Sequence, residues 1–241
     1  MTRDRLAGTG IALLVLLGAA ASVLRARFPA DLGARLEPHR GRLMRSLGLA
    51  DPDARLRAAE VARFDSSFSA HPAPALLHVV PGGLFLAFAP LQFSARLRTR
   101  HPRIHRWSGR ALLLAGLASG LNGLYFGLLM PFAGPPEAAA IALFGGLFVL
   151  ALVRGFVAVR RRDLARHREW MIRAFAIALG ISTVRLIGAV LDLALAPAGV
   201  APAIVFVLSV WLGWLITLTA AEVWIRRTRP RTIEAGALVT A

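Results

Sequence analysis

Long runs of apolar residues, separated by short polar segments, dominate the pattern along the chain. A helix needs about 20 mainly apolar residues to cross a hydrocarbon core of roughly 30 Å. The stretches that meet this length are Leu6–Leu24, Pro74–Leu97, Trp107–Leu129, Ala138–Val159, Trp170–Leu195 and Ala203–Ile225. The pattern therefore predicts an all-α integral membrane bundle of six transmembrane helices.

The polar segments divide the chain into parts of different character. We expect a first transmembrane helix at 1–24, an external amphipathic segment at 25–73, a five-helix transmembrane core at 74–226 and a cytoplasmic tail at 227–241. Within the external segment, Leu43–Leu49 and Ala54–Val61 favour short amphipathic helices that lie on the membrane surface or cap the bundle. The first helix could be a cleaved signal peptide, but its long apolar run favours an uncleaved signal anchor.

Arginine is concentrated on alternate sides of consecutive spans. Arg96–Arg110, Arg154–Arg173 and Arg226–Arg231 are strongly basic, whereas Met130–Glu137 and Ala196–Pro202 contain no basic residue. Because basic loops stay on the cytoplasmic side, this pattern predicts an N-in/C-in topology in a bacterial inner membrane. The net charge of +16 would suit nucleic acid, but its distribution indicates a membrane protein with no nucleic-acid partner, in contact with anionic lipid headgroups.

The composition further limits the kinds of binding and catalytic site that the protein can contain. The chain is 56% hydrophobic and 17% charged, as expected for a membrane protein, and it contains no cysteine. The absence of cysteine excludes disulfides, iron–sulfur clusters and thiolate metal sites. The sequence has no H-E-x-x-H motif, no P-loop and no recognisable Ser-His-Asp set, so enzyme activity stays an open question.

Helical periodicity places a histidine on a face of small or polar residues in three spans. His78, His105 and His167 belong to the second, third and fifth spans respectively. We expect these three spans to form the centre of the bundle, with the first, fourth and sixth packed around them.

One hypothesis for function is a b-type haem protein that moves electrons. His105 and His167 lie at the cytoplasmic ends of two central helices, so their imidazoles could ligate haem iron from facing helices. Arg106, Arg110 and Arg168 would then pair with the haem propionates.

A second hypothesis is a transporter or ligand-binding protein for a small molecule or anion. Its site would consist of His78, Asn122, Arg185 and Asp192 in the outer half, with Gln92 deeper in the bundle. A charge as deep as Arg185 usually faces a partner or a wet cavity, and Asp192 on the same helix face is a candidate partner. Six spans are few for a monomeric transporter, so a homodimer is expected.

Two further alternatives remain open. The protein could be a non-catalytic accessory protein whose inner arginines hold anionic lipid headgroups, or a membrane enzyme acting on lipid or isoprenoid substrates.

Three motifs resemble a known family. The runs are HVVPGGLFLAFAPLQF, which contains His78, Gln92 and Phe93; RLRTRHPRIHRWSGR, which contains His105, Arg106, Gly109 and Arg110; and HREWMIR, which contains His167, Arg168, Trp170, Met171 and Arg173. Together they resemble the bacterial predicted membrane proteins of the domain-of-unknown-function 2306 family, over about Pro74 to Asp192. The resemblance implies a multi-pass membrane protein and carries over no catalytic residue.

Overall fold

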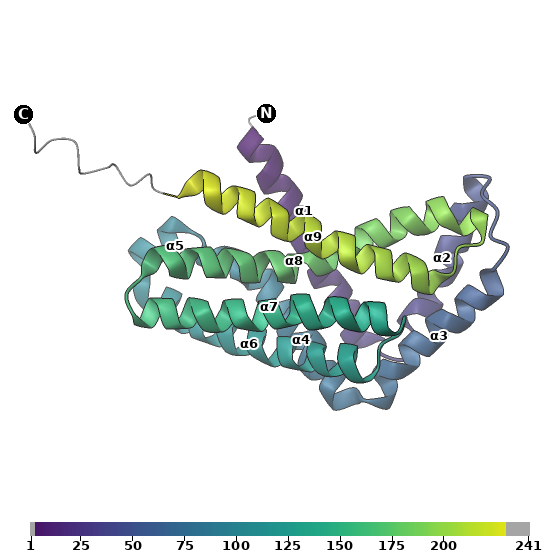
Figure 1. Ribbon diagram of the computed structural model, residues 1–241, viewed down its shortest axis with the longest axis horizontal. Coiled ribbons are helices and arrows are strands. Elements are labelled where there is room, and N and C mark those ends of the chain that lie inside the picture. The colour runs from purple at the N-terminus through teal and green to yellow at the C-terminus, as the bar shows by residue number, and fades with distance from the viewer. Residues whose placement is uncertain (1–2, 230–241) are drawn as a thin grey trace, which may run out of the picture.

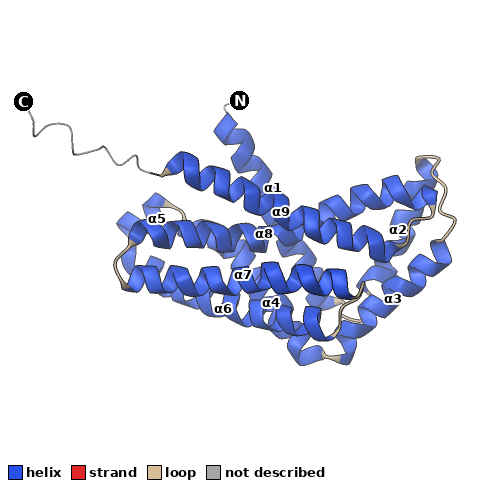
Figure 2. Ribbon diagram, in the orientation of Figure 1, coloured by secondary structure: helices blue, strands red, loops and turns tan. Residues whose placement is uncertain are grey.

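The computed structural model describes residues 3–229, which are helical apart from short loops (Figures 1 and 2). The α-helices are α1 (Arg3–Arg27), α2 (Leu32–Ser46), α3 (Ala54–Ala70), α4 (Pro72–Gln92), α5 (Ala95–Arg100), α6 (Pro102–Leu129), α7 (Pro135–Arg160), α8 (Leu164–Leu195) and α9 (Pro202–Thr228), and a 3₁₀ turn spans Ala196–Ala198. Residues 230–241 of the expected tail lie outside the described residues. The all-α prediction is confirmed.

Six of the helices, α1, α4, α6, α7, α8 and α9, are long and apolar enough to cross a membrane. Their outward faces carry large apolar side chains: Leu13, Leu114 and Leu129 are 62%, 68% and 66% exposed. In water such a surface would drive association, whereas a bilayer accommodates it. The predicted six-span helical bundle is therefore confirmed.

Helices α4, α6, α7 and α8 form a ring. Helix α4 packs on α6, α6 on α7 and α7 on α8, and α4 also contacts α8, so α6 and α8 lie diagonally across from each other. Helix α1 lies against α4 and α8, and α9 runs along α8. Figure 1 shows the ends of this bundle as two distinct regions. We call the end with α5 and the α7–α8 turn the basic end, and the end covered by α2 and α3 the capped end.

The expectation that the fourth span is peripheral was wrong. Helix α7 supplies Ala140, Phe144, Phe148, Ala151 and Leu152 to the buried core. The expectation rested on the lack of polar groups in this span. In a bilayer that lack says little, because lipid is as apolar as a protein core and close packing decides which helix is central.

The external segment forms a longer helical hairpin than the pattern predicted. Helix α2 begins at Leu32 rather than Leu43 and continues through Pro38, and α3 continues to Ala70 rather than Val61. A proline inside a helix removes one backbone hydrogen bond, and its ring crowds the carbonyl of the preceding turn. The contacts that fix α2 to its neighbours, described below, offset that loss.

Close backbone approach joins α8 and α9. The indole Nε1 of Trp214 donates to the carbonyl oxygen of Ile177 at 3.0 Å. At Gly213, a β-carbon would lie 2.8 Å from the backbone nitrogen of Val184 and 2.9 Å from its Cα. Only glycine fits there, because a neighbouring backbone cannot move aside as a flexible side chain can.

We predict that Gly213→Ala destabilises the bundle by about 1–3 kcal/mol through overpacking. The matched control is Gly146→Ala on α7, because a β-carbon there meets nothing within 4 Å. Thermal unfolding in detergent, followed by tryptophan fluorescence, should show a lower Tm for the first variant only. Equal Tm values for both variants would contradict the close packing of α8 on α9.

Candidate functional site

The carboxylate of Asp192, near the end of α8, joins the membrane bundle to the hairpin of α2 and α3. It accepts a hydrogen bond from Nη1 of Arg57 on α3 at 2.5 Å and another from Nε of Arg40 on α2. The expected pairing of Asp192 with Arg185 was wrong. The hairpin brings two other guanidinium groups to this carboxylate, and helical periodicity within one span could not reveal them.

The ion-pair network continues through Arg40. Its Nη1 donates to Asp51 at 2.6 Å and to Glu37 at 3.1 Å. The hydrogen bond from Arg40 holds the pKa of Asp51 below its usual range. Arg57 is only 3% exposed. Its Nε and Nη2, and Nη2 of Arg40, are buried without a hydrogen-bond acceptor among residues 3–229.

A second carboxylate fixes the other side of the hairpin. Asp65 on α3 is 1% exposed and accepts from Nη1 of Arg25 on α1 at 2.6 Å. It also accepts from the backbone N–H of Gly33 at 2.8 Å, at the start of α2, where free N–H groups favour a negative charge. The Arg25 guanidinium also lies 4.7 Å from the ring centre of Phe68. The hairpin is thus held to both α1 and α8.

A cavity of about 300 Å³ lies between the hairpin and the capped ends of α8 and α9. Its lining is mostly apolar, with five charged residues. The apolar and small residues are Val61, Phe64, Phe132, Val184, Gly188, Pro202, Val205, Phe206 and Ser209, and the charged ones are Glu37, Arg40, Arg57, Arg185 and Asp192.

Arg185 differs from the other two arginines of the cavity. Its Nη1 donates to the carbonyl oxygen of Ile181 on its own helix at 3.0 Å. No carboxylate among residues 3–229 forms an ion pair with it, whereas Arg40 and Arg57 share Asp192. The cavity lining therefore contains one arginine that forms no ion pair among the described residues.

The other residues predicted for this site are outside the cavity lining. His78 is tied to α6, because its Nδ1 lies 2.9 Å from the carbonyl oxygen of Ser119 and its own carbonyl accepts from the Ser119 hydroxyl at 2.8 Å. Asn122 donates to Ala118 on its own helix. Gln92 is at the basic end, where its side chain donates to Ser108 at 2.8 Å. The predicted set is thus divided among three places.

Arg40 and Arg57 are the residues that the sequence reasoning missed. The external segment shows no catalytic signature, and its arginines look like those of any solvated helix. One signal was present, namely that an aspartate inside a membrane span requires a cation, and the external segment is rich in arginine.

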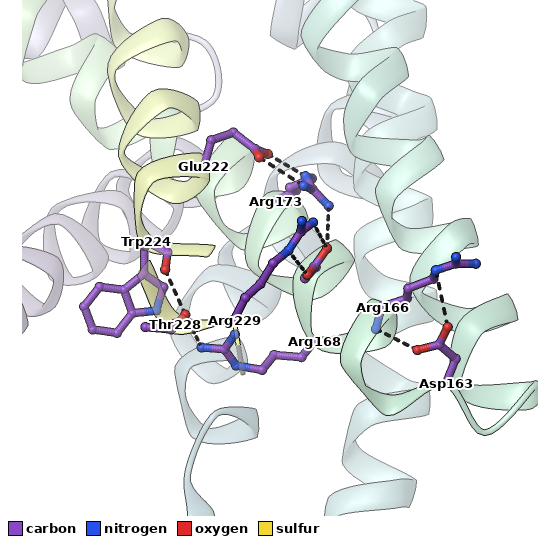
Figure 3. A network of polar contacts seen from close by, with 9 residues as sticks. Asp163, Arg166, Arg168, Arg173, Glu222, Trp224, Thr228 and Arg229 are labelled. Carbon is purple, nitrogen blue, oxygen red and sulfur yellow. Dashed lines mark hydrogen bonds and ion pairs between the residues drawn. The ribbon is translucent and has the colours of Figure 1, made fainter. Parts of the chain in front are cut away.

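The residues predicted for a haem lie together at the basic end. His105 is on α6 and His167 on α8. Arg106 is exposed, and Arg110 lies over the Trp107 ring at 5.0 Å. Arg168 is already engaged, because its Nη2 donates to the hydroxyl of Thr228 on α9 at 2.9 Å (Figure 3).

Ion pairs join α8 to α9 at this end, as Figure 3 shows. Arg173 on α8 donates to both carboxylate oxygens of Glu222 on α9, at 2.5 and 3.0 Å. Glu169 accepts from Arg229 at 2.7 and 2.9 Å. Arginine groups of the third motif, HREWMIR, therefore stabilise helix packing.

These features define a multi-pass α-helical membrane protein with a helical hairpin, α2 and α3, that covers one end of the bundle. Residues 75–225 match the family model described as predicted membrane protein, DUF2306, and the chain belongs to that family. Searches of curated proteins and of solved structures gave no match. The family description assigns no activity.

We predict that Asp192→Asn loosens the hairpin. Removing this charge takes from Arg57 its closest ion-pair partner and from Arg40 one of three partners. Breaking a largely buried ion pair costs about 3 kcal/mol. Hydrogen exchange measured by mass spectrometry should become faster in α2 and α3. Asp31→Asn is the matched control, because Asp31 and its partner Arg35 are 45% and 55% exposed and such a surface pair contributes under about 1 kcal/mol. Unchanged exchange in Asp192→Asn would contradict the anchoring role.

Acid should also loosen the ion pair between Asp51 and Arg40 in the hairpin. Since Arg40 lowers the pKa of Asp51, the stabilisation from Asp51 is fully present above the ordinary carboxyl pKa of about 4 and is lost as the pH falls through the lowered value. Proteolysis of the hairpin should therefore accelerate below about pH 4, and less so in Asp51→Asn. The same acceleration in both proteins would contradict a role for Asp51.

Proposed function

We propose that the protein binds a small amphipathic anion, with an apolar body and one carboxylate or phosphate head, in the cavity at the capped end. The observation that carries this proposal is that Arg185 lines an apolar cavity without a carboxylate partner. The Arg185 side chain is exposed at the protein surface within a membrane span. A cation at such a depth normally has a counter-charge, and a ligand would supply it here.

The charges of the cavity support a single negative charge on the ligand. Arg40, Arg57 and Arg185 face the carboxylates of Glu37 and Asp192. The two arginines of the hairpin are paired with Asp192 and with Asp51 behind the lining, so Arg185 is the arginine of the lining that forms no ion pair among the described residues. The unpartnered N–H groups of Arg40 and Arg57 are extra donors for an oxygen-rich head, and charge-assisted hydrogen bonds of this kind are strong.

The rest of the lining supports an apolar body. Phe64, Phe132 and Phe206 contact one another edge-on or tilted, with ring centres 5.4 to 6.0 Å apart. Val184 and Val205 extend this wall on α8 and α9. A volume of about 300 Å³ is at the small end of ligand sites, so the site suits a short acyl chain or one head of a larger lipid.

The proposed topology indicates the side of the membrane from which the ligand would enter. With both termini in the cytoplasm of a bacterial cell, the capped end faces outward and the cavity lies at the outer leaflet of the inner membrane. Amphipathic anions concentrate at that boundary. Binding for transport and binding for sensing would both use such a site.

We predict that decanoate and decyl phosphate raise the Tm of the purified protein, whereas methyl decanoate and inorganic phosphate do not. Arg185→Leu should weaken decanoate binding about 10- to 100-fold, because a hydrogen bond to a charged group contributes roughly 1.5–3 kcal/mol. The titration is followed by Tm, which rises with ligand occupancy.

Arg55→Leu is the control for this titration, because Arg55 is an exposed arginine of α3 outside the cavity lining. It should bind decanoate as the unaltered protein does. Equal stabilisation by the methyl ester, or equal affinity in Arg185→Leu, would contradict the proposal. Stabilisation by phosphatidylglycerol alone would favour the lipid-binding accessory role instead.

A further inference from the structure

A second cavity lies at the basic end of the bundle, between α8 and the end of α9. Its volume is about 280 Å³, and its lining consists of Ala165, Arg168, Glu169, Thr228 and Arg229. Figure 3 shows the side chain of Arg168 reaching from α8 to Thr228 on α9. The two cavities share no lining residue, so a ligand of this one can be tested separately from a ligand of the other.

The one carboxylate of this lining is compensated by the protein itself. Both oxygens of Glu169 accept hydrogen bonds from Arg229, at 2.7 and 2.9 Å. Arg173 lies 3.8 Å from the same carboxylate. Because two guanidinium groups are within ion-pair distance of it, Glu169 presents little negative charge to a ligand in the cavity.

Arg168 is the arginine of this lining that has no carboxylate partner. It forms no ion pair among residues 3–229, whereas Arg229 and Arg173 both do. Its Nη2 donates to the neutral hydroxyl of Thr228 at 2.9 Å. That hydroxyl donates its own proton to the carbonyl oxygen of Trp224 at 2.8 Å. The half-buried guanidinium is thus fixed in place by a neutral group, and its positive charge is not compensated.

The chemistry of Arg168 suits a phosphate. A guanidinium group has five N–H donors, and the hydrogen bond to Thr228 uses one of them. The planar fork matches two oxygens of a phosphate at once. An anion of this kind would supply the counter-charge that the described residues do not give to Arg168.

The apolar surroundings indicate that the phosphate belongs to a lipid. Val223 and Trp224, about one turn before Thr228 on α9, are 42% and 49% exposed, and Leu164, next to Ala165, is 66% exposed. Tryptophan at the end of a membrane span typically lies at the level of the lipid headgroups. A cavity of about 280 Å³ suits a headgroup rather than a whole lipid, so the acyl chains would remain outside, against these side chains.

We propose that Arg168 binds the phosphate diester of an anionic phospholipid in the cavity between α8 and α9. Basic pockets between transmembrane helices bind the headgroups of such lipids, and the cytoplasmic leaflet is rich in them. The bound headgroup joins the two helices at the same end as the ion pair of Arg173 with Glu222.

The test is thermal unfolding of the full-length protein in micelles of phosphatidylcholine with increasing mole fractions of phosphatidylglycerol. Bound lipids are counted in parallel by native mass spectrometry. Phosphatidylglycerol should raise the Tm saturably, because a ligand of the folded state stabilises it. Arg168→Gln should need about tenfold more phosphatidylglycerol for the same rise, since a hydrogen bond to a charged group is lost. Inorganic phosphate should raise the Tm of neither protein.

Two variants serve as controls. Arg166→Gln removes the same charge from a side chain that is 76% exposed and paired with Asp163, so it should respond to phosphatidylglycerol as the unaltered protein does. Glu222→Gln breaks an ion pair between α8 and α9 outside the cavity lining. It should lower the Tm without added lipid and keep the rise that phosphatidylglycerol causes, which separates loosened helix packing from a lost ligand.

An unchanged response in Arg168→Gln, or an equally weakened response in either control, would overturn the proposal. Equal stabilisation by inorganic phosphate would mean that the site takes a free anion and not a lipid. Phosphatidylglycerol binding that is weakened by Arg185→Leu and not by Arg168→Gln would place the lipid in the other cavity and would equally overturn it.

Discussion

The ion pairs of Asp192 with Arg40 and Arg57 are the contact on which the capped end of the molecule depends. They join a helical hairpin outside the predicted core to the last turns of a membrane helix. Without them, the buried Arg57 would lose its closest counter-charge, and neither arginine would join the hairpin to α8. The hairpin supplies five of the fourteen residues that line the cavity at the ends of α8 and α9. Asp65 secures the other side of the hairpin through Arg25 and the start of α2.

The helical architecture could be predicted because hydrophobic length is a strict requirement for crossing a bilayer. The order of the helices in space could not be predicted in the same way. Polar residues drew attention to the second, third and fifth spans, yet α7, the fourth span, supplies five of the eleven buried residues of the packed core. Which apolar helix is surrounded by others depends on shape complementarity across the whole bundle, and periodicity within one span does not contain that information.

The candidate sites were predictable to different degrees. Arg185 was recognised because a charge deep in a span requires an explanation. Its surroundings were not, since Asp192 is paired with residues 135 and 152 positions away in the sequence. The placement of His105 and His167 at one end of the bundle followed from the chain alone. The hydrogen bond between Nδ1 of His167 and the carbonyl oxygen of Gly155 depends on how α7 and α8 pack, which periodicity within one span does not show.

The most direct test of the central claim, that the capped cavity holds an amphipathic anion beside Arg185, is photo-crosslinking. The full-length protein in nanodiscs would be irradiated with a decanoate that carries a diazirine at its tail, and the labelled peptides mapped by mass spectrometry. The account predicts labels on the cavity wall around Phe132 and Phe206, removed by excess decanoate. Labels spread over the lipid-facing leucines of α1 and α6, and unaffected by competition, would contradict it.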